Sequence, residues 1–185
     1  RVVGLAGPLA PFNADIGGSA NFSTPWIATL GARWQATERL AINAQVNRIG
    51  WSEFDEITVT SPAINETLPQ RYNDVTTGGM GVDYMVNERL TLRAGAQYDP
   101  TPTPDELRTA RVPDGDRWLY GVGASAMLSD SLTMDAALSY ITFDESQVNH
   151  DTTFYEGTPA ETVTRLRGDV NGEGAILSLG LRKTF

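Results

Sequence analysis

The sequence contains one histidine, the residue type that most often acts as a catalytic base. His150 is followed by Asp151 and preceded, four positions earlier, by Ser146, so the three residue types of a hydrolytic triad occur together. A triad requires the base to lie within hydrogen-bond reach of the nucleophile and to be oriented by a third group, and this spacing does not enforce that arrangement. We therefore interpret His150 as a surface residue and predict no catalytic residues and no enzyme.

The sequence also lacks the usual ligands for metals and nucleotides. It contains no cysteine and a single histidine, which excludes a thiolate or multi-histidine metal site. No glycine-rich phosphate-binding loop of the form G-x-x-x-x-G-K-[ST] occurs. Acidic residues number 23 against 14 basic ones, and the net charge of −9 argues against nucleic acid as a partner. We predict no cofactor.

Composition does not separate a soluble chain from a membrane β-barrel. Hydrophobic residues make up 41% of the 185 positions and the mean hydropathy is −0.25. No apolar run approaches the roughly 18 residues that a spanning helix needs. A spanning barrel is compatible with these values, because each of its strands presents only one apolar face.

Hydrophobic residues recur with a period of two along most of the chain. Between 20 and 35, for example, Phe22, Trp26, Leu30 and Trp34 fall on one face, and the other face is mostly polar or small. This alternation is typical of a strand with lipid on one side and a wet lumen on the other. We predict one β-barrel segment over 1–185, with an outer loop at 1–17 and strands at about 18–35, 40–60, 71–86, 90–99, 117–128, 131–148 and 166–185.

The connections between these strands alternate in length. Short polar turns are expected at 36–39, 86–89 and 129–130, and long polar connections at 61–70, 100–116 and 149–165. Outer-membrane barrels show this alternation, with short periplasmic turns and long outer loops. Aromatic residues gather near the strand ends, as in the two interfacial girdles of such barrels: Trp34, Tyr84 and Phe185 on the short-turn side, and Tyr98, Trp118, Tyr120 and Tyr140 on the long-loop side.

Seven strands cannot close as an antiparallel barrel, because the first and the last would run in the same direction. An open sheet edge cannot face lipid, since its backbone groups would be unpaired. The fold class that we predict is therefore all-β: an antiparallel transmembrane segment of about seven strands that belongs to a larger barrel in the outer membrane of a Gram-negative cell.

Three segments resemble the FadL family of outer-membrane proteins. The first is 24–54, TPWIATLGARWQATERLAINAQVNRIGWSEF, a strand, turn and strand that ends in Trp-Ser-x-Phe. The second is 98–128, YDPTPTPDELRTARVPDGDRWLYGVGASAML, with its Pro-Asp-x-Asp-Arg loop. The third is the terminal strand ending in Phe185, which is a general feature of outer-membrane proteins. The resemblance covers roughly 20–185.

The resemblance implies a fourteen-stranded barrel, plugged by an N-terminal hatch, that takes up fatty acids or other hydrophobic molecules. The chain would form the C-terminal half of such a barrel, and the hatch has no counterpart in it. The implied partners are a hydrophobic small molecule, outer-membrane lipid, and either missing N-terminal strands with a hatch or another chain to close the barrel.

Six residues are predicted to bind ligand on this basis: Arg33, Trp51, Phe54, Arg93, Arg108 and Arg117. An inward arginine could meet a fatty-acid carboxylate. The favoured alternative for Arg33, Arg93 and Arg182 is a structural ladder of ion pairs with the lumen acids Asp83, Asp99 and Asp135. The aromatic pair Trp51 and Phe54 could line a hydrophobic groove or anchor a strand end at the interface.

Arg108 and Arg117 lie at the predicted outer rim, near Asp114 and Asp116. A clamp that holds the mouth of the barrel in shape is the favoured alternative there, because Pro-Asp turns are commonly structural. Three other functions stay open at this point: an outer-membrane enzyme that uses His150, a structural or adhesive barrel, and a soluble β-sandwich binding module. The sequence does not distinguish a fatty acid from an aromatic hydrocarbon as the cargo.

Overall fold

The computed structural model describes residues 17–61, 65–155 and 157–184. In these ranges almost all of the regular structure is β-strand, with two single turns of 3-10 helix, η2 (Trp51–Glu53) and η3 (Asp105–Leu107). Within the described ranges no helix is long and apolar enough to cross a membrane. The predicted girdle residue Phe185, and the expected outer loop up to residue 16, lie outside the described residues.

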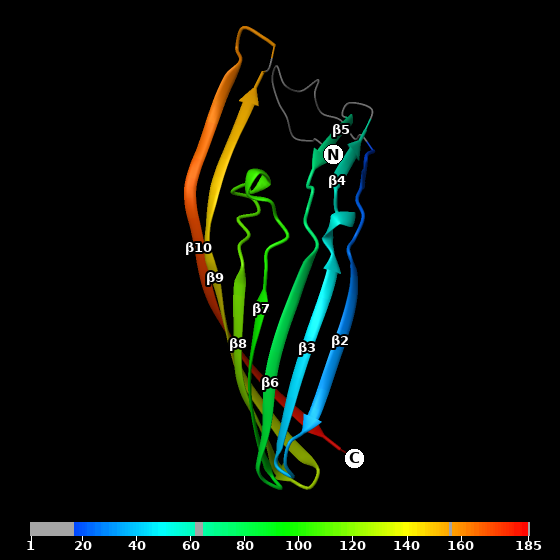
Figure 1. The fold of residues 1–185 in the computed structure, drawn as a ribbon, viewed down its shortest axis with the longest axis vertical. Helices are drawn as coiled ribbons and strands as arrows, with labels where there is room; N and C mark the ends of the chain where they lie inside the picture. The colour runs from blue at the N-terminus through cyan, green and yellow to red at the C-terminus, as the bar shows by residue number, and fades with distance from the viewer. Residues whose placement is uncertain (1–16, 62–64, 156, 185) are drawn as a thin grey trace, which may run out of the picture.

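Seven antiparallel strands form the main sheet in the order β10-β9-β8-β7-β6-β3-β2. Strands adjacent in the sheet are also consecutive along the chain, apart from the excursion between β3 and β6, so the sheet is a meander. It curves like a section of barrel wall, with the tight turns at the lower end of Figure 1 and the long connections at the upper end. The strands are β2 (Trp26–Gln35), β3 (Leu40–Gly50), β6 (Val75–Asn87), β7 (Leu90–Asp99), β8 (Arg117–Ser129), β9 (Leu132–Phe154) and β10 (Thr162–Lys183).

Two predicted strands are interrupted in the structure. The strand expected at 18–35 divides into β1 (Ser19–Asn21) and β2, because Pro25 has no N–H with which to continue the ladder. The strand expected at 40–60 ends at Gly50, where the chain turns through η2 before β4 (Glu56–Thr60). The outer pieces pair with β5 (Asn65–Pro69) as a three-stranded sheet of order β1-β4-β5, above β2, β3 and β6 in Figure 1.

The long connections also differ from the prediction. The expected loop at 61–70 contains β5, and most of the expected loop at 149–165 belongs to β9 and β10, whose pairing runs out to Phe154 and Thr162. This hairpin extends beyond the other strands of the main sheet (Figure 1). The connection at 100–116 is irregular, as expected, and contains η3.

The described chain has almost no apolar interior. Its buried hydrophobic residues are Ala41, Val75 and Val148, whereas Leu30 is 77% exposed and Leu179 is 74% exposed. A soluble β-sandwich would cover such an apolar face with a second sheet. The three-stranded sheet instead lies beyond the end of β3 (Figure 1), so the apolar face is suited to lipid and not to a sandwich core.

Aromatic rings gather on the long-loop side of β7, β8 and β9. The rings of Tyr98 and Trp118 lie 5.0 Å apart, and those of Trp118 and Tyr120 stack at 6.0 Å. The Tyr98 hydroxyl donates a hydrogen bond to Asp116, as the Tyr140 hydroxyl does to Glu173. Rings with an apolar body and a polar tip are suited to the boundary between hydrocarbon and water.

Gly50, at the end of β3, provides a test of the packing in this wall. It is paired in register with Trp26, and a Cβ at Gly50 would lie 2.0 Å from the indole Nε1 atom. Gly50→Ala must therefore displace the indole of Trp26, and we expect a loss of about 1–3 kcal/mol in the free energy of unfolding of the complete barrel. A urea titration monitored by tryptophan fluorescence measures both the free energy of unfolding and the altered environment of Trp26.

The matched control is Gly168→Ala in β10, where the new methyl group would meet nothing within 4 Å. It should leave stability nearly unchanged. Equal effects of the two substitutions would contradict the packing described for Trp26.

Candidate functional site

The concave face of the main sheet carries a hollow with a nearly bare floor. Gly81, Gly95 and Gly121 are paired in register across β6, β7 and β8. A Cβ at Gly95 would lie 2.9 Å from the carbonyl oxygen of Met80, so a larger residue at Gly95 would collide with the neighbouring strand. The glycines thus allow the strands to curve closely and leave no side chains in the floor.

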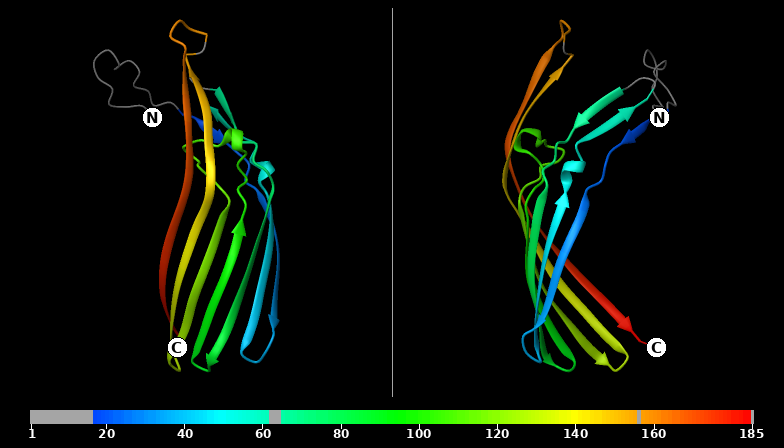
Figure 2. Two further views of the ribbon diagram at one scale, coloured as in Figure 1. Left: turned by 60° about the vertical axis from the view of Figure 1, so that its left-hand side comes forward. Right: turned by 45° about the vertical axis from the view of Figure 1, so that its right-hand side comes forward.

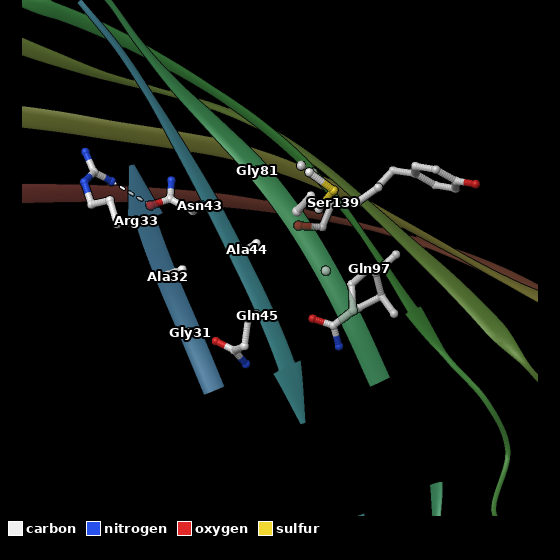
Figure 3. A pocket seen from close by; sticks show the side chains of 16 residues that line it. Gly31, Ala32, Arg33, Asn43, Ala44, Gln45, Gly81, Gln97 and Ser139 are labelled. Atoms are coloured by element: carbon white, nitrogen blue, oxygen red, sulfur yellow. Dashed lines mark hydrogen bonds between the residues drawn. The ribbon is translucent and has the colours of Figure 1, made fainter. Parts of the chain in front are cut away.

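We call this hollow the lumen furrow (Figure 3). Its volume is about 620 Å³. Glycine and alanine predominate in its lining, with Leu119 and a few polar side chains on the inner face; Met80 and Tyr120 contribute backbone, because their side chains alternate with those of the glycines and point to the other face. The lining residues are Gly31, Ala32, Arg33, Asn43, Ala44, Gln45, Gly79, Met80, Gly81, Gly95, Ala96, Gln97, Leu119, Tyr120, Gly121 and Ser139.

Asp83 joins two arginines toward the short-turn end of the furrow. The Arg33 Nη1 atom lies 2.5 Å from Asp83 Oδ2 and also donates a hydrogen bond of 2.9 Å to Asn43 Oδ1. On the other side, Arg93 Nε lies 3.6 Å from Asp83 Oδ1. One carboxylate on β6 therefore faces guanidinium groups from β2 and β7.

The chain of contacts continues to the far side of the sheet. Arg93 Nη1 donates to Ser125 Oγ at 2.6 Å, and the Ser125 hydroxyl donates to Asp135 on β9. The resulting lumen belt crosses six neighbouring strands and consists of Arg33, Asn43, Asp83, Arg93, Ser125 and Asp135. Two members of the predicted ladder lie elsewhere: Asp99 contacts Arg117, and Arg182 pairs in register with Thr133 near the strand ends.

Four aromatic rings form a cluster at the outer end of β3. Phe54 is central, with ring centroids 6.0 Å from Phe22, 6.3 Å from Trp51 and 5.2 Å from Tyr72, and Trp51 lies 5.7 Å from Tyr72. The sequence prediction identified Trp51 and Phe54 and missed Phe22 and Tyr72. These two lie in irregular segments, and only the turn at η2 brings them next to Phe54. The alternation that placed Phe22 on the apolar face therefore did not indicate the cluster.

Asp74 holds the turn on which this cluster depends. Its Oδ1 atom accepts a hydrogen bond of 2.9 Å from the backbone N–H of Ser52 in η2, and its Oδ2 atom lies 3.5 Å from Arg48 Nη2. The N–H of Ser52 is the main reason that the pKa of the Asp74 carboxyl lies below its ordinary value of 3.8. Asp74 lies one residue before β6 and two residues after Tyr72, so it links both sides of the cluster.

Arg108, predicted as a ligand-binding residue, is instead enclosed by its own loop. Its side chain is 4% exposed and lies 2.8 Å from the Asp105 carboxylate. It also donates to the carbonyl oxygens of Asp114 at 2.7 Å, Gln147 at 3.3 Å and Thr103 at 3.5 Å. These contacts join the connection 100–116 to β9, so the structure favours the loop clamp over ligand binding.

Arg117 belongs to the same loop clamp. Its Nε atom lies 3.4 Å from Asp99 Oδ2, its Nη1 atom lies 3.5 Å from Asp114 Oδ1, and its guanidinium carbon lies 5.9 Å from the centre of the Phe143 ring. Asp116 completes the clamp by accepting the backbone N–H of Thr101 at 2.8 Å. Of the six predicted ligand-binding residues, only Arg33, Trp51, Phe54 and Arg93 lie in the furrow, the belt or the aromatic cluster.

His150 has no triad around it. Ser146 and His150 lie four residues apart on the same strand, roughly 13 Å along an extended chain. The Ser146 hydroxyl donates to the Val170 carbonyl oxygen at 3.4 Å, and Asp151 pairs with Arg167 at 2.6 Å. Among the described residues no group of three or more histidine or acidic side chains could hold a metal ion.

The fold and this face define a class of protein. A curved antiparallel sheet with an apolar outer face, aromatic rings near its long-loop end and a glycine-floored inner furrow is part of the wall of a β-barrel of the outer membrane. The family model described as "Outer membrane protein transport protein (OMPP1/FadL/TodX)" matches residues 3–185. The chain therefore belongs to this family, whose members are transport proteins and not enzymes, and the resemblance inferred from the sequence is confirmed.

Individual relatives agree with this assignment. Outer membrane protein P1 of Haemophilus influenzae is 28% identical over 128 residues, which is 67% of this chain and 27% of that protein. The long-chain fatty acid transport protein of Escherichia coli strain K12 is 24% identical over 149 residues, 79% of this chain and 33% of that protein. The chain thus spans about a third or less of the length of these relatives.

Solved structures share the fold. A FadL homologue from Pseudomonas aeruginosa superposes with a TM-score of 0.79 at 30% identity, over 90% of this chain and 37% of that one. The CymD monoaromatic hydrocarbon channel superposes with a TM-score of 0.58 at 19% identity, over 91% of this chain and 38% of that one. The predicted fold class, a segment of a larger outer-membrane barrel, is confirmed.

The link from Asp74 to η2 should depend on pH. Because the folded-state pKa is lowered, the stabilisation is complete above the ordinary value of 3.8 and is lost as the pH falls through the lower folded value. We expect the Ser52 amide to become less protected from hydrogen exchange, relative to its intrinsic rate, between pH 6 and pH 3. Asp74→Ala should lack protection at both pH values, and equal protection in this variant and the original protein would contradict the assignment.

The loop clamp can be tested with two arginines from one loop. Arg108→Met removes a buried cation and leaves three carbonyl groups without their donor, at an expected cost on the order of 1–3 kcal/mol to docking of the loop. Limited proteolysis should therefore cut 100–116 much faster in this variant. Arg111→Met, at an exposed position of the same loop, is the control, and identical cleavage of both variants would show that Arg108 does not hold the loop.

Proposed function

We propose that the complete barrel takes up hydrophobic small molecules passively across the outer membrane and that this chain supplies part of its conducting wall. The observation that carries the proposal is the lumen furrow. Its floor of glycine and alanine offers smooth, weakly polar backbone, and Leu119 adds apolar surface. Such a surface suits an apolar molecule in motion, because it forms few specific contacts that would hold the molecule in place.

The route that we propose begins at the aromatic cluster. Phe22, Trp51, Phe54 and Tyr72 would capture an apolar molecule at the outer end of β3 by removing its surface from water. The molecule would then follow the lumen furrow toward the lumen belt, where polar side chains from six strands lie between the furrow and the short-turn end. Capture and passage would thus be assigned to different parts of the same wall.

The partners that we propose for this chain cover the outer face of the sheet and pair with its two edges. Outer-membrane lipid would cover the apolar convex face. In the described part of the chain β2 and β10 each pair with a neighbour on one side only. Because an unpaired strand edge is costly in hydrocarbon, further strands must complete the wall. We propose that these come from an N-terminal half with its hatch or from another chain.

The named relatives support a hydrophobic cargo without specifying it. One is a transport protein for long-chain fatty acids, and another solved structure is a channel for monoaromatic hydrocarbons. Both cargoes are largely apolar, and they differ in whether a charged carboxylate is present. Apolar character is therefore the property that we carry over to this chain.

The aromatic cluster provides the test. Replacing Trp51 and Phe54 together with alanine removes two of the four rings, and since burying one such side chain is worth about 1.5–3 kcal/mol, we expect uptake at limiting ligand concentration to fall by about tenfold or more. Uptake of a radiolabelled hydrophobic compound by cells that carry the complete barrel measures this change.

Phe154→Ala is the matched control, because it removes an exposed ring from the outer hairpin, away from the cluster. Uptake at the original rate by the double variant would exclude capture by the cluster. Uptake no greater than in cells without the barrel would refute the proposed function itself.

A further inference from the structure

We propose that the lumen furrow selects uncharged hydrophobic molecules over carboxylates of the same size, and that Asp83 is the residue that determines this selectivity. The inference rests on the proposed function and goes further by naming the class of cargo. It follows from the charges in the described wall and from how each charge is paired.

The lining of the furrow is nearly free of charge. Among the described residues that line it, Arg33 alone carries a charged side chain. The other polar groups, on Asn43, Gln45, Gln97 and Ser139, are neutral amides and a hydroxyl. They can exchange hydrogen bonds with a hydroxyl or carbonyl group, but they cannot neutralise a carboxylate that has left water.

Arg33 and Arg93, the two arginines of the belt, are both already paired with a carboxylate. Asp83 lies 2.5 Å from Arg33 and 3.6 Å from Arg93. A ligand carboxylate at Arg33 would have to replace Asp83 or approach it, and two carboxylates that share one site repel each other. An uncharged ligand meets neither obstacle.

The charges of the belt sum to zero. Arg33 and Arg93 contribute +2, and Asp83 and Asp135 contribute −2. Asp135 takes part through Ser125, which accepts from Arg93 and donates to Asp135. Arg182 lies outside the residues that line the furrow, opposite Thr133 and near the end of the strands. A carboxylate in the furrow therefore gains no unpaired cation from the belt.

The experiment compares uptake of 1-decanol and decanoate, which share a chain length and differ in charge. Uptake is measured in cells that carry the complete barrel, relative to cells without it. We expect the original protein to favour decanol. Asp83→Asn leaves Arg33 and Arg93 without their shared counter-ion, and the ratio of decanoate to decanol uptake should rise about fivefold, the upper range for a partly exposed ion pair.

Two further variants separate this mechanism from a general change in charge. Glu145→Gln removes one negative charge from the exposed outer part of β9 and should leave the ratio unchanged. Combining Arg33→Gln with Asp83→Asn returns the belt to zero net charge, and the ratio should fall back toward its original value. If Asp83→Asn changed the ratio only by disturbing the fold, removing a second charged side chain from the same belt would not restore the ratio.

Each outcome decides the inference. Decanoate uptake that equals or exceeds decanol uptake in the original protein overturns it and leaves transport standing. An unchanged ratio in a folded Asp83→Asn barrel removes Asp83 as the selective residue, and the original ratio still decides the class of cargo if that variant fails to fold. Uptake of neither compound above the level of cells without the barrel refutes the proposed function together with this inference.

Discussion

The structure depends on one constraint, which is that a strand in hydrocarbon must pair its backbone groups within the protein and present only apolar side chains to lipid. The seven strands meet the first condition through continuous antiparallel pairing and the second through alternation of side chains. The same constraint explains why Leu30 and Leu179 are so exposed in this chain. It also explains why few hydrophobic residues are buried, since the hydrophobic environment of a barrel lies outside its wall.

The inner face obeys a different requirement, because charges beside a partly enclosed lumen are stable only when they have partners. Asp83 serves two arginines at once, and the contacts pass through Ser125 to Asp135. At the outer rim, Arg108 and Arg117 are enclosed by loop carbonyl groups and carboxylates. Polar contacts thus order both ends of the wall, and the glycine-floored furrow lies between them.

The outer end of the wall shows how a local break in the ladder creates a site. At Gly50 the strand ends, the chain turns through η2, and Asp74 holds the turn through the backbone N–H of Ser52. Trp51 and Phe54 thereby meet Phe22 and Tyr72. Along the chain, Phe22 lies between β1 and β2, and Tyr72 lies between β5 and β6. A longer, uninterrupted β3 would have kept these four rings apart.

The sequence by itself determined the fold class, the positions of the short turns and the apolar face, because alternation with a period of two is a local property of each strand. It also indicated that the arginines of the lumen would have acidic partners, without establishing which pairs form. Only the tertiary structure decided that Asp83 joins Arg33 to Arg93, that Arg108 is buried in a clamp, and that η2 gathers four aromatic rings. These contacts join residues up to 50 positions apart, and they depend on strand register and on where the chain leaves the ladder, which no local pattern encodes.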